Sequence, residues 1–233
     1  MIKAAITALF AAAMVATALG QTNTYVFNFA VDGAVPDGDA NGMINQQTVA
    51  GTLGTISDLN VTISVDVART ADLYAYLTFD GQISILLNRV GISSTNPLGY
   101  GAPGLNITLD DQAASNVHWY EQFSPAFDAS GRLLGTWQPD GRAVDPDNVN
   151  ETVNPTALLN QFNNLPANGT WTLFVADMSS DGEPTVLVNW GLEITTVPEP
   201  EPLFLVVSGA FLLWCFRRIK LRNSEWLRSS GRE

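Results

Sequence analysis

The sequence predicts an all-β fold, either a sandwich or a barrel, for the greater part of the chain. Short segments alternate apolar and polar residues with the period of two that is typical of half-buried strands. Gly, Pro, Asn and Asp separate these segments, and the sequence contains neither a helical heptad nor an internal repeat. Long uncharged apolar runs occur only near the two ends, at residues 4–19 and 203–216. One all-β domain between two targeting segments is therefore expected.

Five segments carry the strand pattern: residues 61–67, 73–79, 83–87, 171–175 and 186–194. Asp80-Gly81, between the second and third segments, is typical of a tight hairpin turn. Trp171 and Trp190 lie on the apolar phase of the fourth and fifth segments, so both are expected in the core. In the third and last segments the other inward residues should be Ile83, Ile85, Leu87, Val186, Val188, Leu192 and Ile194. Residues 96–165 are loop-rich, with one short helix turn expected over 155–162.

Residues 1–20 have the pattern of a secretory signal peptide. Lys3 precedes the Ala-rich stretch 4–19, and Ala18-Leu19-Gly20 places small residues at the positions that define cleavage. Gln21 is the expected first mature residue. A retained N-terminal anchor is the alternative, although small residues at the end of the stretch suit cleavage better. The sequence therefore predicts an exported protein.

The end of the chain places three features in the order of a sorting signal. Residues 197–202 open with Val197, Pro198, Glu199 and Pro200, and they should stay extended because proline joins neither a helix nor a sheet ladder. Residues 203–222 are predicted to form a membrane helix, and residues 223–233 a cytoplasmic tail. The helix ends in a basic cluster that holds it on the cytoplasmic side: Arg217, Arg218, Lys220 and Arg222. This order resembles the PEP-CTERM signal of bacterial surface proteins, which a membrane transpeptidase called an exosortase recognises. An ordinary membrane anchor is the alternative.

The predicted exported domain is strongly acidic. Between residues 21 and 197, nineteen Asp and Glu residues face four Arg residues, which leaves a net charge of −15. Such a surface repels nucleic acid and attracts divalent cations or cationic partners, so we exclude nucleic acid as a partner. Solubility alone is the alternative explanation for the acidity. The domain contains no cysteine, since Cys215 lies in the C-terminal apolar run, so no disulfide stabilises it.

The two closing segments, residues 169–177 and 189–192, carry a family resemblance in which they are adjacent strands. Together with residues 35–42, 54–63 and 72–77 they resemble, in order, segments of the P domain (P/Homo B). This domain follows the protease domain of subtilisin-like proprotein convertases. The resemblance implies a jelly-roll-like β-sandwich over residues 21–196. It also implies a domain without catalytic residues, because the convertases carry catalysis in a separate domain.

The residues themselves give little support to catalysis. His118 is the only histidine, it lies in an apolar stretch, and no Gly-x-Ser-x-Gly nucleophile elbow occurs. We therefore expect a structural histidine and no peptidase activity. Asp110 and Asp111 could serve as paired carboxylates for glycoside hydrolysis, but the abundance of acidic residues makes such pairs easy to find by chance.

Calcium is the cofactor that the acidic loops favour, because hard cations bind carboxylate and amide oxygens. The first candidate group alternates oxygen donors before a glycine: Asp37, Asp39 and Asn41. The later glutamate of an EF-hand is absent. The second group forms only if the fold brings three segments to one end: Asp72, Asp177 and Asp181. For both groups the alternative is turn formation, in which these side chains bind loop backbone groups.

Three classes of function remain. The one that we favour is a non-catalytic module at the cell surface or in the extracellular matrix, derived from a membrane-anchored precursor. Its partners would be a cation, an extracellular polysaccharide or a separate protease. The second class is an accessory to a serine-type, subtilisin-like endopeptidase, which an apolar surface patch would support. The third is a glycan-acting enzyme, which requires a cleft with two carboxylates at a set spacing.

Overall fold

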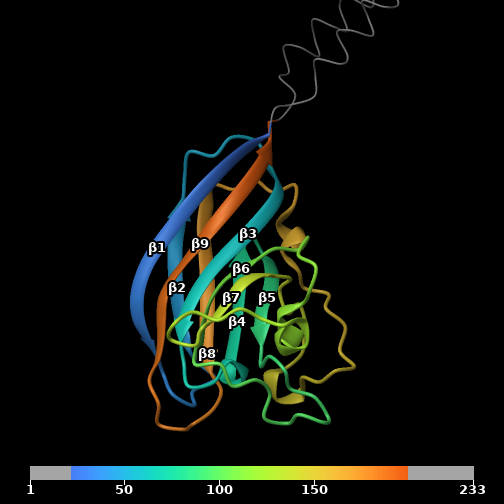
Figure 1. Ribbon diagram of the computed structural model, residues 1–233. Helices are drawn as coiled ribbons and strands as arrows, with labels where there is room; N and C mark the ends of the chain where they lie inside the picture. The colour runs from blue at the N-terminus through green and yellow to red at the C-terminus, as the bar shows by residue number, and fades with distance from the viewer. Residues whose placement is uncertain (1–21, 199–233) are drawn as a thin grey trace, which may run out of the picture. The chain divides into compact units, whose positions relative to one another are not determined.

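The computed structural model describes residues 22–198 (Figure 1). The strands of this part are β1 (Asn23–Val35), β2 (Met43–Val49), β3 (Thr55–Asp66), β4 (Leu73–Phe79), β5 (Gln82–Asn88), β6 (Gly104–Leu109), β7 (Leu133–Trp137), β8 (Gly169–Asp177) and β9 (Thr185–Val197). Four short 3-10 helices lie in its loops: η1 (Thr70–Asp72), η2 (Val117–Phe123), η3 (Pro146–Asn148) and η4 (Leu159–Phe162).

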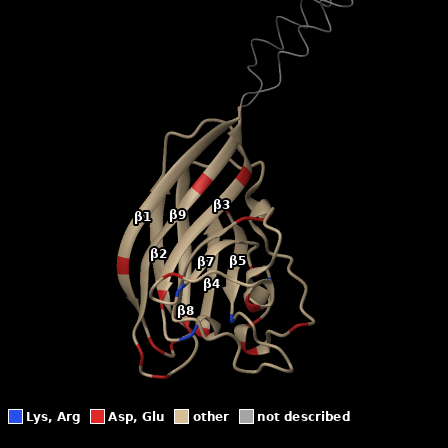
Figure 2. Cartoon of the chain, in the orientation of Figure 1, with Lys and Arg blue, Asp and Glu red and all other residues tan. Residues whose placement is uncertain are grey.

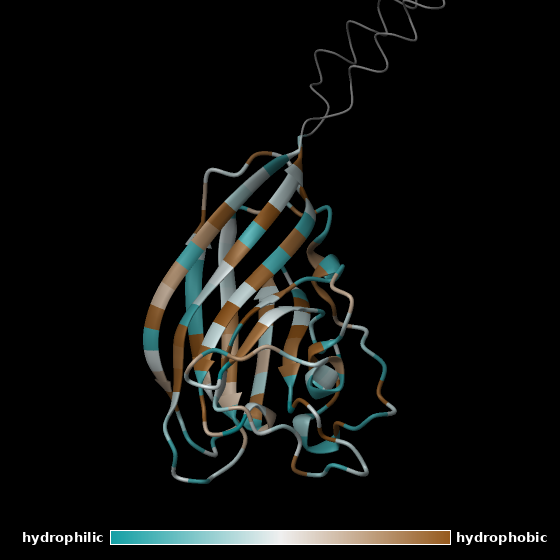
Figure 3. Cartoon of the chain, viewed as in Figure 1, coloured by the Kyte–Doolittle hydropathy of each residue, from teal (hydrophilic) through white to brown (hydrophobic). Residues whose placement is uncertain are grey.

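The strands form two sheets, which confirms the predicted all-β sandwich. One sheet has the order β1-β9-β3-β6-β7, and the other has the order β2-β8-β4-β5. Within the described residues all neighbouring strands are antiparallel except β6 and β7, which are parallel. Figure 1 shows β1, β9 and β3 in front of β2, β8 and β4, and Figure 3 shows the alternation of apolar and polar residues along the front strands.

The core lies between the sheets, where the sequence predicted it. Val61, Ile63 and Val65 of β3 are buried, as are the alternate residues of β4 from Leu73 to Phe79. Both predicted tryptophans are fully buried. They enter the core from opposite sheets, however, because β8 and β9 are not the neighbouring strands that the resemblance implied.

The β4–β5 hairpin turns where it was predicted. Asp80 and Gly81 both have positive φ (48° and 76°), as a type I′ turn requires, and Phe79 pairs with Gln82 across it. Gly81 adopts this conformation without strain, and Asp is among the residues that tolerate it best.

For β5 and β9 the sequence prediction assigned some side chains to the wrong face of the sheet, because each strand contains a bulge. In β5, Ser84 lies opposite the core residue Leu77, so Ile83 and Ile85 lie on the other face of the sheet, where Ile83 is exposed and Ile85 is buried. The register shifts at Leu86, and Leu87 returns to the core. In β9, a shift next to Val188 makes Leu187 the buried residue in place of Val186 and Val188. One extra residue in a strand reverses which face its side chains occupy.

The loop that follows β7 covers β5, the edge strand of the four-stranded sheet. The backbone N–H of Ile85 donates to the Ala157 carbonyl at 2.9 Å, and the N–H of Gly141 donates to the Ile85 carbonyl at 2.9 Å. Further along this loop, η4 confirms the short helix turn that was expected within residues 155–162. The loop thereby satisfies backbone groups that an open edge would leave without partners.

The predicted targeting segments lie almost entirely outside the described residues. Val197 ends β9, where Thr55 pairs with it, so the compact unit ends one residue later than the predicted boundary at residue 196. The signal peptide (1–20), the rest of the sorting motif after Pro198, the membrane segment (203–222) and the tail (223–233) are not described. No helix within residues 22–198 is long and apolar enough to cross a membrane.

Candidate functional site

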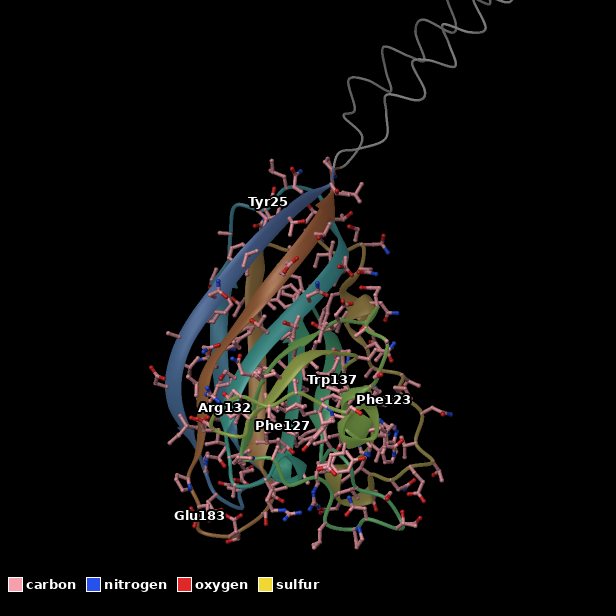
Figure 4. All side chains as sticks on the ribbon, viewed as in Figure 1. Tyr25, Phe123, Phe127, Arg132, Trp137 and Glu183 are labelled. Atoms are coloured by element: carbon pink, nitrogen blue, oxygen red, sulfur yellow. The ribbon has the colours of Figure 1, made fainter. Side chains whose placement is uncertain are left out.

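The two predicted calcium groups lie together at one end of the sandwich. The Asp37 carboxylate, in the β1–β2 loop, accepts from the backbone N–H groups of Asp181 (3.3 Å) and Gly182 (3.1 Å) in the β8–β9 loop. Figure 2 shows acidic residues gathered on the loops at this end, and Figure 4 shows Glu183 there, far from Tyr25 at the other end. We call this region, residues 36–42 and 177–184 with Asp72, the acidic end.

Asp72 and Asp177 form the buried part of the acidic end. Asp177 lies opposite Leu73 in the β4–β8 ladder, so the residue before Leu73 is brought next to it. Asp72 and Asp177 are only 5% and 2% exposed. From the sequence, Asp72 and Asp177 were expected to lie close together only if the sandwich placed their segments at the same end. The observed topology does so.

The two carboxylates differ in what binds them. Asp177 is satisfied, because its oxygens accept from the Ser179 N–H at 3.1 Å and from the Thr185 hydroxyl at 2.5 Å. Oδ2 of Asp72 is buried and has no hydrogen-bond partner among the described residues. An unsatisfied buried carboxylate oxygen is costly, so Asp72 is the group at this end that a bound ligand would stabilise.

Burial raises the pKa of the Asp72 carboxyl above its ordinary value, and the Asp177 carboxylate raises this pKa further. Arg69 and Arg89 partly offset the rise. Because the native pKa exceeds the unfolded one, the unfolded chain releases this proton first as the pH rises. Asp72 therefore adds stability at a pH below its unfolded pKa, and this contribution is lost as the pH rises through the native pKa.

Asp39 and Asn41 form a turn, which was the alternative interpretation of the first calcium group. Oδ1 of Asp39 accepts from the Asn41 N–H at 2.9 Å and from its side-chain amide at 2.8 Å. Gly42 follows with φ of 51°, and a Cβ there would lie 2.4 Å from the Val175 carbonyl oxygen. This part of the loop is therefore explained by backbone geometry alone. Within residues 22–198, no three His, Cys, Asp or Glu side chains are placed to hold a metal ion. A cation at the acidic end would need backbone carbonyls and water as further ligands.

His118 belongs to a buried charged network, as a structural histidine would. Its Nδ1 lies 2.6 Å from Asp140 Oδ2, and its Nε2 lies 3.1 Å from the Ile92 carbonyl oxygen. The Asp140 carboxylate also accepts from Arg142 Nη1 at 3.2 Å, and the Arg142 guanidinium lies 5.5 Å from the centre of the Trp119 ring. Both ring nitrogens of His118 face acceptors, so neither is placed to take a proton from a nucleophile.

The Asp110-Asp111 pair is also used locally. The Asp111 carboxylate accepts from the N–H groups of Leu159 (3.0 Å) and Asn160 (2.7 Å) at the start of η4, and Asp110 accepts from the Gln112 N–H at 2.7 Å. Burial raises the pKa of Asp111, and the two backbone hydrogen bonds lower it in part. Helix capping and turn formation account for the positions of both carboxylates.

Sequence reasoning missed a pocket of about 520 Å³ between two loops. One wall is formed by residues 89–97 after β5, and the other by residues 146–152. Neither loop carries a recognisable motif, and the loops are about fifty residues apart in the chain. Asp140 and Arg142 were missed for the same reason, since no periodic pattern connects them with His118.

Comparisons with known proteins do not assign the chain to a family. No protein-family model matches the sequence, and no curated protein matches it. One similar solved structure is the serine protease of Aeromonas sobria in complex with its chaperone, with 18% identity and a TM-score of 0.44 over 78% of this chain. Another is the serine protease of the same organism, with 19% identity and a TM-score of 0.43 over 76% of this chain. The match covers only 28% of the other chain in each case. At these values neither structure is grounds for an activity or a family, and the P-domain and PEP-CTERM resemblances stay predictions.

Proposed function

We propose that the chain is a non-catalytic exported module that an exosortase-type system sorts to the cell surface or the extracellular matrix. In this proposal the acidic end binds a divalent cation, with calcium the best candidate, or a cationic partner. The observation that carries the proposal is the buried carboxylate of Asp72, which has an oxygen without a partner beside Asp177. The occupied ring nitrogens of His118 support the non-catalytic part of the proposal.

The strand order supports a P-domain-like jelly roll. With β7 set aside, β1-β9-β3-β6 faces β2-β8-β4-β5. This is the order that two Greek keys produce when a folded-over hairpin wraps into two four-stranded sheets. The parallel edge strand β7 is an addition to that plan.

A cation at the acidic end would stabilise the folded domain. The melting temperature should therefore be higher in millimolar calcium than in EDTA. The free energy of unfolding should rise by about 2.7 kcal/mol if calcium is at a hundredfold excess over Kd. Asp72→Asn should abolish this shift, and without calcium it should make the domain more stable at neutral pH than the unmutated protein. Acidification should stabilise the unmutated protein relative to this variant, because of the raised pKa of Asp72.

Asp39→Asn is the matched control, because asparagine can form the same turn and Asp39 already has its partners. The calcium shift should persist in this variant. An identical melting midpoint with and without calcium in the unmutated protein would show that the acidic end only forms turns.

The sorting part of the proposal concerns the two ends of the chain. Removal of residues 1–20 and processing near residues 198–202 should leave the acidic domain outside the cytoplasmic membrane. Mass spectrometry of envelope and medium fractions measures both ends. Recovery of chains that all end at Glu233 would indicate a plain membrane anchor.

The second candidate, an accessory to a separate serine-type endopeptidase, is favoured by one surface. On the outer face of the four-stranded sheet, Ile44 lies opposite Phe174, and Phe174 lies opposite Tyr76. The rings of Tyr76 and Phe174 stack at 4.6 Å, and Ile44 is 61% exposed. An apolar row of this kind can dock a partner domain. Deleting the gene should then lower endopeptidase activity in the envelope, and restoring it with Ile44→Asp should not recover that activity. Full recovery with this variant would count against the accessory role.

A further inference from the structure

The pocket between residues 89–97 and 146–152 has the features of a built binding site. Its volume of about 520 Å³ lies within the range that small-ligand sites occupy. Two contacts join its walls: Ser94 N–H donates to the Glu151 carboxylate at 2.8 Å, and Arg89 lies 3.7 Å from Asp147. The distance between the loops is therefore set by specific bonds.

Buried polar groups hold the bases of both walls. Nε2 of His118 lies 3.1 Å from the Ile92 carbonyl oxygen in the first wall. The Asn88 amide donates to the carbonyls of Arg142 and Val144, both at 3.0 Å, just before the second wall. Buried charged and polar networks stabilise a fold weakly but fix geometry well. Here the network holds the base of each loop, in addition to the two contacts that join the walls directly.

Arg89 is the only basic residue among the described residues that line the pocket. Its backbone has φ of 47°, a conformation that non-glycine residues rarely adopt and that clusters at functional sites. Its Nε donates to the Ala71 carbonyl at 3.4 Å, and its ion pair with Asp147 is long and exposed, since the Asp147 side chain is 77% exposed. Most of the guanidinium donors are thus available to a ligand.

We propose that this pocket binds a neutral polysaccharide through residues of the sugar chain. Arg89 and Asp147 offset each other in charge, and Glu151 already accepts from the N–H and the hydroxyl of Ser94. The remaining lining combines hydroxyl and amide groups with apolar Pro97 and Val149. Sugar hydroxyls both donate and accept hydrogen bonds, and the C–H faces of the rings contact apolar surface. The charge of −15 on residues 21–197 repels a polyanion.

This inference deepens the proposed function, because it names a partner class for the non-catalytic surface module. It uses a site separate in residues from the acidic end. Because Arg89 also lies near enough to Asp72 to lower its pKa, the two sites are told apart on the unmutated protein, by calcium melting for one and by calorimetry for the other.

Titration calorimetry on the full chain, in a polyoxyethylene detergent that carries no sugar, tests the inference. The probes are oligosaccharides of dextran, mannan, xylan and cellulose, with oligo-alginate and oligolysine as charged comparisons. At least one neutral oligosaccharide should bind. Arg89→Gly, which removes the guanidinium and tolerates positive φ, should weaken that binding about tenfold or more.

Arg132→Ala is the matched control, because it removes the same charge outside the pocket, where Asp128 binds Arg132 at 2.7 Å. It should leave affinity unchanged. Binding of oligolysine or oligo-alginate alone, no binding of any neutral probe, or equal affinity in folded Arg89→Gly would overturn the assignment. Mass spectrometry of the bound oligosaccharide separates this inference from the proposed function. An intact sugar supports both, whereas hydrolysis would contradict the non-catalytic role and leave the pocket as a binding site.

Discussion

Truncating Trp171 to alanine is expected to lower the free energy of unfolding by about 3–5 kcal/mol, enough to unfold a domain of ordinary stability. Trp171 is fully buried, its ring stacks on Phe79 with centroids 4.1 Å apart, and it contacts the Phe162 ring at 5.1 Å. Its Nε1 donates to the Ala167 carbonyl at 3.0 Å. The substitution would therefore leave a cavity and a buried acceptor without its donor.

Chemical denaturation followed by far-ultraviolet circular dichroism measures this loss. Leu98→Ala is the control, because Leu98 is among the exposed apolar residues and its truncation should change stability by less than about 0.5 kcal/mol. A loss below about 1 kcal/mol for Trp171→Ala would mean that the two sheets do not pack around this ring.

Replacing Asp140 with alanine is expected to cost about 3–5 kcal/mol, because it removes the only carboxylate of a buried charged network. Asp140 and His118 are fully buried and Arg142 nearly so. Without Asp140, the Arg142 guanidinium loses its ion pair at 3.2 Å and the His118 ring loses its contact at 2.6 Å. His118 Nδ1 would then face no acceptor, and the buried Arg142 guanidinium would keep only neutral acceptors, Asn116 Oδ1 and the backbone carbonyl of residue 140.

Urea unfolding with tryptophan fluorescence is the measurement, since Trp119 lies under Arg142 and reports on the network. Asp66→Ala breaks an exposed ion pair with Arg132 and should cost less than about 1 kcal/mol. Similar, small losses in the two variants would contradict a buried ionic network. If the Asp140 variant folds, its pocket loops should also lose their fixed spacing, which weaker binding of the neutral oligosaccharide would report.

The local pattern predicted those strands in which the period of two is unbroken. It succeeded for β4 and for the predicted part of β3, which begins at Val61, because the inward residues there alternate without interruption. It failed for the phases of β5 and β9, where bulges at Leu86 and Val188 reverse the faces. Whether a strand bulges depends on its neighbours' register, which alternation within one strand does not contain. The strands β1, β2, β6 and β7 were not among the predicted segments, although Tyr25, Phe27 and Phe29 alternate clearly in β1.

The candidate sites divide in the same way. The acidic loops could be named from composition and spacing, and the meeting of Asp72 with Asp177 followed once a two-sheet sandwich was assumed. That the members of the first calcium group would bind different partners could not be predicted. Asp37 turned out to bind the β8–β9 loop and Asp39 its own turn, because the same residue types serve metal binding and turn formation.

By itself, the sequence determined the all-β class, the burial of Trp171 and Trp190, the acidity of the domain and the structural role expected of His118. These follow from periodicity and composition, which are local properties of the chain. Only the tertiary structure decided the sheet order, the unsatisfied oxygen of Asp72, and the pocket that joins residues 89–97 to 146–152. Each of these depends on contacts between residues distant in the chain, and the energy of such contacts leaves no periodic trace in the sequence.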